Sequence, residues 1–394
     1  MAPLRFLQVS DLRYGAVPAL PELDVDARVR RLLVEDQRRM LDRIVSLAAE
    51  HRADVVLVAG DLLDDAHATP EHADQLVRAL ASLSPRPVLM SPGDLDPPHP
   101  ASYLSPEVLE LMGKGALPTN LTVFRATAPT MALVAGIAVT GWAIPGRGVA
   151  GADAPVERPA GPRSALASLP KPPAGTRHHV LLAHQGAAVL PVVPTPQQLT
   201  VAGITYLALG GHEATSLERD IDGHVRVARA GHPFPNRMSA THGGVLLGEI
   251  DERGGVAVEV ADSGARRIHV VPCDVTGVDP GELVAHLRLT LKSRGVREQD
   301  LALVKLSGIW RSARLPQLSR RALEPACTHL KLDPTDLVLA LQNGPTVRDL
   351  HRAGLVPRSG EPRGPVQLEA LRLVDAAWEG GEVIPSGENP SDPV

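Results

Sequence analysis

Short apolar runs alternate with amphipathic segments along the first half of the chain, and this alternation constrains the fold more than any other feature. Residues 4–10 and 54–61 read as buried strands, and the Leu, Met and Ile side chains over 26–51 have helical spacing. A second helix is predicted over 70–83, and a strand over 87–94 follows it. Strands that alternate with helices in this order are typical of an α/β domain with a parallel sheet.

The 394 residues are enough for two domains. Further strand-like runs lie at residues 121–144, 179–186, 204–211, 225–231, 243–250 and 255–260. We predict a first domain over 1–262, in which residues 145–175 are a Gly/Pro/Ala-rich irregular insert. A strand–helix–strand pattern then predicts a smaller α/β domain over 263–350. The segment 351–394 ends in a stretch without an apolar face and is predicted to be mostly disordered.

Acidic residues, histidines and glycines stand where several of these strands end. Asp11, Asp61, Asp94, His184 and His212 all occupy such positions. A single strand-terminal Asp more often caps the next helix than binds a metal. Ligands bind outside the carboxyl ends of strands in open α/β sheets, however, and oxygen and nitrogen donors together suit Mn²⁺, Mg²⁺, Fe or Zn²⁺. The whole set therefore predicts a divalent-metal site. A site of this kind that holds two ions can clamp a phosphate between them.

Composition excludes several other classes of protein. Three Phe, three Trp and three Tyr are too few for rows of stacked bases, and a net charge of −5 argues against a uniformly basic surface. Two cysteines, Cys273 and Cys327, cannot form a zinc tetrahedron or a disulfide framework. No apolar run approaches the length of a membrane span. We expect a cytoplasmic protein that does not enter a membrane.

The motifs at these strand ends resemble those of the calcineurin-like metallophosphoesterases, and most of all those of the SbcD-type DNA repair exonuclease subunits. The matching segments are QVSDLR, VAGDLLD, SPGDLD, VLLAHQG, YLALGG and ARAGHPFP. The resemblance covers residues 4–240 clearly and 265–345 more loosely. It implies a four-layer α/β/β/α fold with a smaller α/β capping domain. It also implies homodimers that bind DNA and an SbcC-type ATPase.

Of the family's first three motifs, two depart from the family pattern in this sequence. The family's first motif is Asp-x-His, but here it reads Asp11-Leu12-Arg13. Its GDxxD motif is intact, and the resemblance makes Asp61 the metal-bridging carboxylate. The Gly-Asn-His-Asp motif has become Gly93-Asp94-Leu95-Asp96, so Leu95 occupies the position of the family's catalytic His, with Asp96 beside it. No residue of the chain is therefore assigned as the catalytic acid.

The second half of the site departs from the family as well. His184 matches an isolated ligand histidine, but the final Gly-His-x-His reads Gly210-Gly211-His212-Glu213. The candidate metal ligands are therefore Asp11, Asp61, Asp94, His184 and Glu213, with His212 if the frame slides by one residue.

Arg13 and Gly211 alter the site because neither can act as a ligand. The guanidinium of Arg13 stays protonated and would be a fixed positive charge beside the metal. Loss of a positioned general acid costs about 10²–10⁴ in rate. We therefore expect one Mn²⁺ or similar ion rather than two, and an impaired or lost phosphodiesterase activity.

A basic stretch in the smaller domain predicts contacts with DNA phosphates. The candidate residues are Arg288, Lys292, Arg311 and Arg314. The favoured function is thus an SbcD-like scaffold or regulatory subunit that acts at DNA ends or with the ATPase. Two alternatives stay open: an active Mn-dependent exonuclease or phosphodiesterase with an altered ligand set, and a protein-interaction module without DNA binding.

Overall fold

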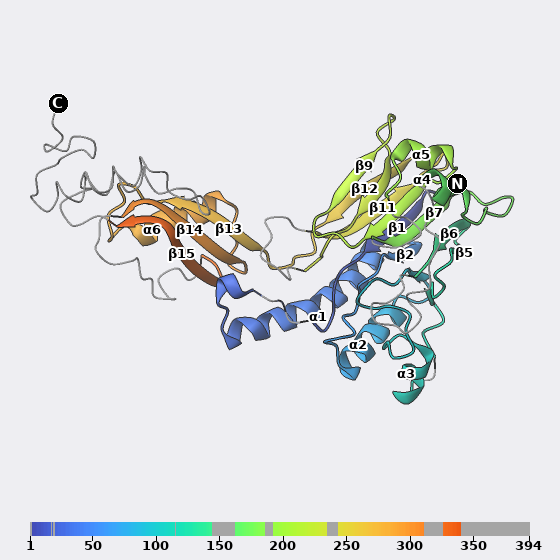
Figure 1. The fold of residues 1–394 in the computed structure, drawn as a ribbon, viewed down its shortest axis with the longest axis horizontal. Coiled ribbons are helices and arrows are strands. Elements are labelled where there is room, and N and C mark those ends of the chain that lie inside the picture. Colours follow the sequence, from blue (N-terminus) through green and yellow to red (C-terminus); the bar gives the residue numbers. More distant parts are fainter. Residues whose placement is uncertain are drawn as a thin grey trace, which may run out of the picture. The chain divides into compact units, whose positions relative to one another are not determined.

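The computed structural model describes residues 2–16, 18, 20–114, 116–143, 162–185, 192–234, 243–310 and 326–339. The chain forms two compact units (Figure 1). The first comprises Met1–Leu20 and Val25–Arg267, and the second comprises Pro21–Asp24 and Ile268–Val394. The predicted disordered segment 351–394 lies outside the described residues. Among the described helices, none combines the length and the apolar character that crossing a membrane requires.

A six-stranded mixed sheet contains the first strands of the chain, in the order β12-β11-β1-β2-β3-β4. Its strands are β1 (Leu4–Val9), β2 (Val55–Val58), β3 (Val88–Met90), β4 (Leu121–Val123), β11 (Val245–Ile250) and β12 (Val256–Ala261). The first four strands run parallel. β11 pairs antiparallel with β1, and β12 pairs antiparallel with β11 at the edge of the sheet. The apolar run of β2 is fully buried, which confirms the prediction of a buried strand over 54–61, and β3 is fully buried as well.

A second six-stranded mixed sheet has the order β5-β6-β7-β8-β10-β9. Its strands are β5 (Thr130–Val134), β6 (Ile137–Gly141), β7 (His179–His184), β8 (Tyr206–Gly210), β9 (Ser216–Arg219) and β10 (Val225–Arg229). The four inner strands β6, β7, β8 and β10 are parallel, so their carboxyl ends lie at one edge of the sheet.

The two sheets pack face to face and share one apolar core. Phe6 of β1 packs against Tyr206 of β8, with ring centroids 4.8 Å apart. Beside them the buried amide of Gln8 donates hydrogen bonds across to the carbonyl oxygens of Leu209 (3.1 Å) and Ala228 (3.0 Å). Because a buried amide without partners is costly, these bonds fix how the first sheet sits on the second.

Most of the described helices of the first unit begin at a side-chain N-cap. They are α1 (Ala27–Glu50), α2 (Pro70–Ala81), α3 (Pro106–Leu111), α4 (Pro162–Ala167) and α5 (Pro196–Val201). Asp26 caps α1 by accepting from the Val29 N–H at 2.8 Å, and α1 packs on β1. The helices predicted over 26–51 and 70–83 are confirmed as α1 and α2.

Helix α4 corrects the prediction of an irregular insert over 145–175. Residues 162–167 are helical because Leu166 and the following Leu169 bury their side chains in a core cluster on the outer face of the second sheet. Residues 144–161 lie outside the described part of the chain.

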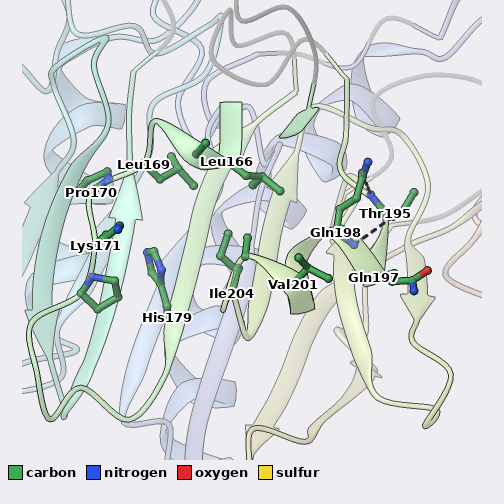
Figure 2. Close-up of a pocket in the computed structure, with 13 residues that line it drawn as sticks. Leu166, Leu169, Pro170, Lys171, His179, Thr195, Gln197, Gln198, Val201 and Ile204 are labelled. Carbon is green, nitrogen blue, oxygen red and sulfur yellow. Dashed lines mark hydrogen bonds between the residues drawn. The ribbon is translucent and has the colours of Figure 1, made fainter. Parts of the chain in front are cut away.

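A cavity of about 780 Å³ lies between α4, α5 and the start of β7 (Figure 2). Its lining is mainly apolar, with His179 as a buried polar member. The His179 ring nitrogen Nε2 lies 2.8 Å from the Thr140 hydroxyl, and burial lowers the pKa of the imidazole. The lining of this cavity contains none of the acidic residues that follow the strand ends.

The second unit is a small parallel sheet with one covering helix. It comprises η1 (Pro21–Leu23), β13 (Ile268–Asp274), α6 (Leu283–Ser293), β14 (Leu301–Trp310) and β15 (His329–Leu339). The sheet order is β13-β14-β15, and Leu283, Leu287 and Leu291 of α6 pack into its core. The chain is thus a mixed α/β protein with two mixed sheets and a small parallel C-terminal sheet.

Candidate metal centre

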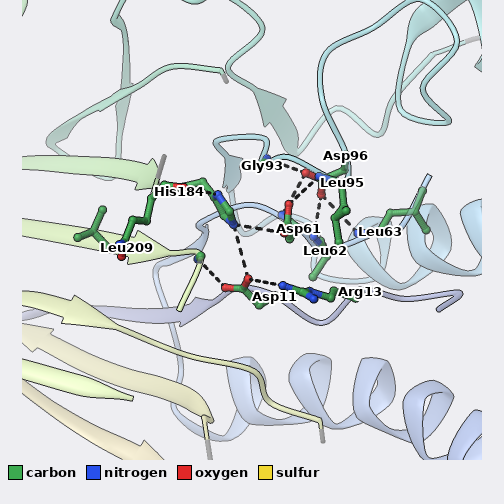
Figure 3. Close-up of polar contacts among 12 residues, drawn as sticks. Asp11, Arg13, Asp61, Leu62, Leu63, Gly93, Leu95, Asp96, His184 and Leu209 are labelled. Carbon is green, nitrogen blue, oxygen red and sulfur yellow. Dashed lines mark hydrogen bonds and ion pairs between the residues drawn. The ribbon is translucent and has the colours of Figure 1, made fainter. Parts of the chain in front are cut away.

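Three strand-end residues from the two sheets converge on one buried point (Figure 3). Asp11 follows β1, Asp61 follows the neighbouring parallel strand β2, and His184 ends β7 of the other sheet. One ligand atom from each residue lies within 4.8 Å of those of the other two, and all three residues are buried. This is the only such group of three acids, histidines or cysteines among the residues that the structure describes.

Glycine at two positions lets the sheets approach this closely. A Cβ atom on Gly210, at the end of β8, would meet the carbonyl oxygen of Ala59 and lie 2.7 Å from the Cβ of Ser10. Gly60 adopts φ +82°, and a Cβ there would lie 2.6 Å from Cδ2 of His184. The glycines beside the acids thus provide the space in which the three side chains meet.

Asp11 directs its two oxygens to different partners. Oδ2 accepts a 2.8 Å hydrogen bond from the backbone N–H of Gly211. Oδ1 lies 3.5 Å from Nε2 of His184 and is buried without a hydrogen bond. Burial acts to raise the pKa of Asp11, but the neighbouring His184 outweighs it, so the pKa is lowered. Asp11 is therefore a carboxylate with one oxygen free for a cation.

Asp61 has a similar division of its oxygens. Oδ1 accepts a 2.9 Å hydrogen bond from the backbone N–H of Leu95, and Oδ2 lies 3.4 Å from Nε2 of His184. Leu95 thus contributes a backbone donor to the site, whereas its aliphatic side chain can neither give nor take a proton.

His184 presents one ring nitrogen to both carboxylates. Its Nδ1 lies 3.1 Å from the carbonyl oxygen of Gln185, which leaves Nε2 to face Asp11 and Asp61. Burial would lower the pKa of His184, but the two carboxylates outweigh it and raise the pKa to about 10. Without an ion, an imidazolium balances the two acids.

The three donor atoms suit one divalent cation. Oδ1 of Asp11 and Nε2 of His184 are buried and lack hydrogen-bond partners, and Oδ2 of Asp61 lies beside them. Buried polar atoms without partners are costly, and an ion would satisfy all three at once. Two carboxylates and an imidazole match the donor preferences of Mn²⁺, Fe or Zn²⁺.

Asp96 holds the loops beneath the site. Its carboxylate accepts hydrogen bonds from the backbone N–H groups of Asp61 (3.0 Å), Leu62 (2.7 Å) and Gly93 (2.7 Å). Burial and the negative charge of Asp61 raise the pKa of Asp96 to about 7. Asp96 therefore fixes the backbone on which Asp61 stands, and sequence reasoning, which noted only that it lies nearby, assigned it no role.

Arg13 lies at the edge of the group. Its Nη2 is 3.9 Å from Oδ1 of Asp11, and its side chain is 22% exposed. The backbone N–H of Arg13 donates to the carbonyl oxygen of Asp61 at 2.9 Å, which fixes where the side chain begins. The guanidinium thus stands beside the oxygen of Asp11 that makes no hydrogen bond.

The structure does not bring every predicted ligand together. Asp94 is half-buried and His212 and Glu213 are exposed, and all three lie outside the group formed by Asp11, Asp61 and His184. Gly211, which has no side chain to offer, contributes its backbone N–H to Asp11.

The predicted DNA-binding residues belong to the second unit. Arg288 and Lys292 are exposed and lie four residues apart on α6, so they share one face of the helix. Arg311 and Arg314 lie outside the described residues.

Comparison with known proteins places the site within a matched region. The family model of the calcineurin-like phosphoesterases matches residues 4–213, which is 210 of the 394 residues and thus more than half of the chain. The match includes Asp11, Asp61 and His184. A search of curated proteins found none that matches this chain.

Proposed function

This chain belongs to the calcineurin-like phosphoesterase family, and we propose that it binds a single divalent ion and hydrolyses phosphodiesters poorly or not at all. The ion, Mn²⁺ by preference, would be held by Asp11, Asp61 and His184. The observation that carries this proposal is the guanidinium of Arg13 beside the free oxygen of Asp11. The four-layer fold of the family is supported by the two sheets packed face to face and by α1 and α4 packed on them.

Arg13 opposes a second ion by its charge. A guanidinium remains protonated at any working pH, and at 3.9 Å from Asp11 it offsets part of the negative charge that a second cation would need. Gly211 adds to this effect because its N–H occupies the other oxygen of Asp11. Asp11 is left with one oxygen for one ion.

The residues of the site divide between binding and positioning. A bound ion would act as a Lewis acid on a phosphoryl oxygen and would lower the pKa of a water. Arg13 offers N–H donors of the kind that pair with phosphate oxygens. Leu95 cannot protonate a leaving group, and the loss of such a proton donor costs about 10²–10⁴ in rate. Binding is therefore retained better than hydrolysis.

We expect one Mn²⁺ to bind per chain. Isothermal titration calorimetry of the purified protein measures the stoichiometry, and a nuclease assay on duplex DNA measures hydrolysis. Asp61→Asn, which replaces a charged ligand oxygen by an amide, is expected to abolish saturable binding. Saturable binding of two ions, together with cleavage that Asp61→Asn removes, would contradict the proposal and favour the active Mn-dependent exonuclease or phosphodiesterase.

The finer proposal is that the protein is an SbcD-like homologue. It would act as a scaffold or regulatory subunit at DNA ends or with an SbcC-type ATPase. We propose that it does so as a homodimer in the cytoplasm. The exposed pair Arg288 and Lys292 on α6 supports contacts with phosphates. The parallel sheet and helix of the second unit support a capping domain.

Duplex binding is expected to weaken when Arg288 and Lys292 are replaced together by Glu. Each lost phosphate contact should also make the affinity depend less on salt concentration. The slope of log affinity against log salt concentration should therefore be smaller in magnitude by about two in the double variant. Fluorescence anisotropy with a labelled duplex at several salt concentrations measures both quantities. Arg31→Glu, on the exposed surface of α1, is the control. If the wild-type protein shows no salt-dependent duplex binding, the protein-interaction module is the better function.

A further inference from the structure

Buried polar atoms without hydrogen-bond partners gather at the metal centre. Six such side-chain atoms occur among the residues that the structure describes, and four of them belong to this place: Ser10 Oγ, Asp11 Oδ1, Arg13 Nε and His184 Nε2. A cation can satisfy the carboxylate oxygen and the imidazole nitrogen, because both can give it a lone pair. It cannot satisfy Nε of Arg13, which is an N–H donor and needs an acceptor. A cation alone therefore does not complete the hydrogen bonding of this group.

Arg13 is held in place by its backbone rather than by its side chain. Its N–H donates to the carbonyl oxygen of Asp61 at 2.9 Å, and its carbonyl oxygen accepts from the side-chain amide of Gln37 at 3.4 Å. The five N–H donors of the guanidinium make no hydrogen bond to any described residue, and the ion pair from Nη2 to Oδ1 of Asp11, at 3.9 Å, is too long to be one (Figure 3). A positioned guanidinium with unused donors can receive an oxyanion.

Arg13 is also the most accessible member of the group. Its side chain is 22% exposed, against 4% or less for those of Asp11, Asp61 and His184. A ligand that arrives from solvent therefore reaches the guanidinium first. In the ion-free centre the two carboxylates would repel an anion there, but a divalent cation bound between them cancels their charge and leaves the positive charge of Arg13. An anion should thus bind only after the cation.

We propose that Arg13 holds a terminal phosphate group, either inorganic phosphate or a phosphomonoester, against the bound ion. The inference rests on the proposed single-ion site and names its ligand. A guanidinium pairs with two phosphate oxygens at once, and a metal ion takes another as a Lewis acid. A terminal phosphate group has three free oxygens for these contacts, whereas a phosphodiester has two. Arg13 thus provides, from the chain itself, positive charge that a second ion would bring to the phosphate.

Replacing Arg13 by glutamine tests this assignment, because it should change two affinities in opposite directions. Calorimetry on the full chain measures the affinity for Mn²⁺, and then the affinity of the Mn²⁺-loaded chain for inorganic phosphate. The phosphate affinity should fall about 10–100-fold in Arg13→Gln, as expected for the loss of a charge-assisted pair. The affinity for the first Mn²⁺ should rise about tenfold, because a positive charge beside it has been removed.

Arg13→Lys separates the charge from the paired donors. It keeps the positive charge, so its affinity for Mn²⁺ should equal that of the wild type. Its phosphate affinity should lie between those of the wild type and Arg13→Gln, because an ammonium cannot pair with two oxygens in the same way. Arg31→Gln, on the exposed surface of α1, is the control and should leave both affinities unchanged.

Matched ligands define the chemical class. Dimethyl phosphate, a diester, should bind about tenfold more weakly than methyl phosphate, since it has one free oxygen and one charge fewer. A 5′-phosphorylated oligonucleotide that binds more tightly than its 5′-hydroxyl counterpart would identify the phosphate as that of a nucleic-acid end. Equal affinity of the two oligonucleotides, with inorganic phosphate bound, would identify free phosphate, and either result supports the assignment. Equal binding of the diester and the monoester would contradict it.

Three further results would decide the matter. If Arg13→Gln loses affinity for Mn²⁺ and for phosphate together while circular dichroism shows an intact fold, Arg13 positions the metal ligands and the inference is wrong. A wild-type chain that binds Mn²⁺ but neither inorganic phosphate nor methyl phosphate would also overturn the inference and leave the single-ion proposal standing. A wild-type chain that binds no Mn²⁺ would overturn the proposed function itself.

Discussion

Replacing Asp96 by alanine is expected to destabilise the first unit by about 3–5 kcal/mol, because four buried backbone donors would lose their acceptor. The donors are the N–H groups of Asp61, Leu62 and Gly93, at 2.7–3.0 Å from the carboxylate, and that of Leu63 at 3.4 Å. Each buried donor left without a partner costs about 1–3 kcal/mol, and alanine has no side-chain oxygen that could accept these hydrogen bonds. Urea unfolding followed by circular dichroism measures the free energy of unfolding.

Asp65→Ala is the matched control for this prediction. Asp65 stands on the loop that carries Asp61, but it is only half-buried, and its carboxylate accepts a long 3.4 Å hydrogen bond from the backbone N–H of Tyr103. We expect a much smaller loss of stability for this variant. If both variants lose the same free energy, Asp96 does not organise the loops that carry Asp61.

The chain's local patterns were sufficient to predict strands such as β1 and β2 and the long helices. The run that ends in Asp61 is apolar at every position because β2 is covered on both faces, and α1 carries its apolar side chains on one stripe. Asp11, Asp61 and His184 could be singled out because each ends a strand, and the parallel register of β1 with β2 and of β7 with β8 brings strand ends to a common edge. The candidate site is therefore a consequence of strand order.

Other contacts have no local signal. The hydrogen bond from Gly211 to Asp11 joins residues 200 positions apart, and it depends on how closely the two sheets pack at Gly210. Helix α4 forms in a Gly- and Pro-rich stretch because tertiary burial of Leu166 outweighs its weak local propensity.

Affinity for the divalent ion is expected to rise about tenfold for each unit of pH between pH 7 and 8.5, because the ion must displace a proton from His184. In the absence of an ion, Asp11 and Asp61 raise the pKa of His184 to about 10, so Nε2 is protonated throughout this range. The ion needs the lone pair of that nitrogen, and one proton should therefore leave for each ion bound. Calorimetry in two buffers of different ionisation enthalpy measures the number of protons released.

The direction in which the stability of the ion-free protein changes with pH distinguishes His184 from the carboxylates. A raised imidazole pKa means that the imidazolium stabilises the ion-free fold fully below pH 6.5, and that this stabilisation is lost as pH rises through about 10. The ion-free protein should become less stable over the same range in which its affinity for Mn²⁺ rises. His184→Gln removes the titrating group, so its residual affinity should lose this pH dependence. A wild-type affinity that is flat between pH 7 and 8.5 would mean that no proton is displaced, and His184 would then not be a ligand.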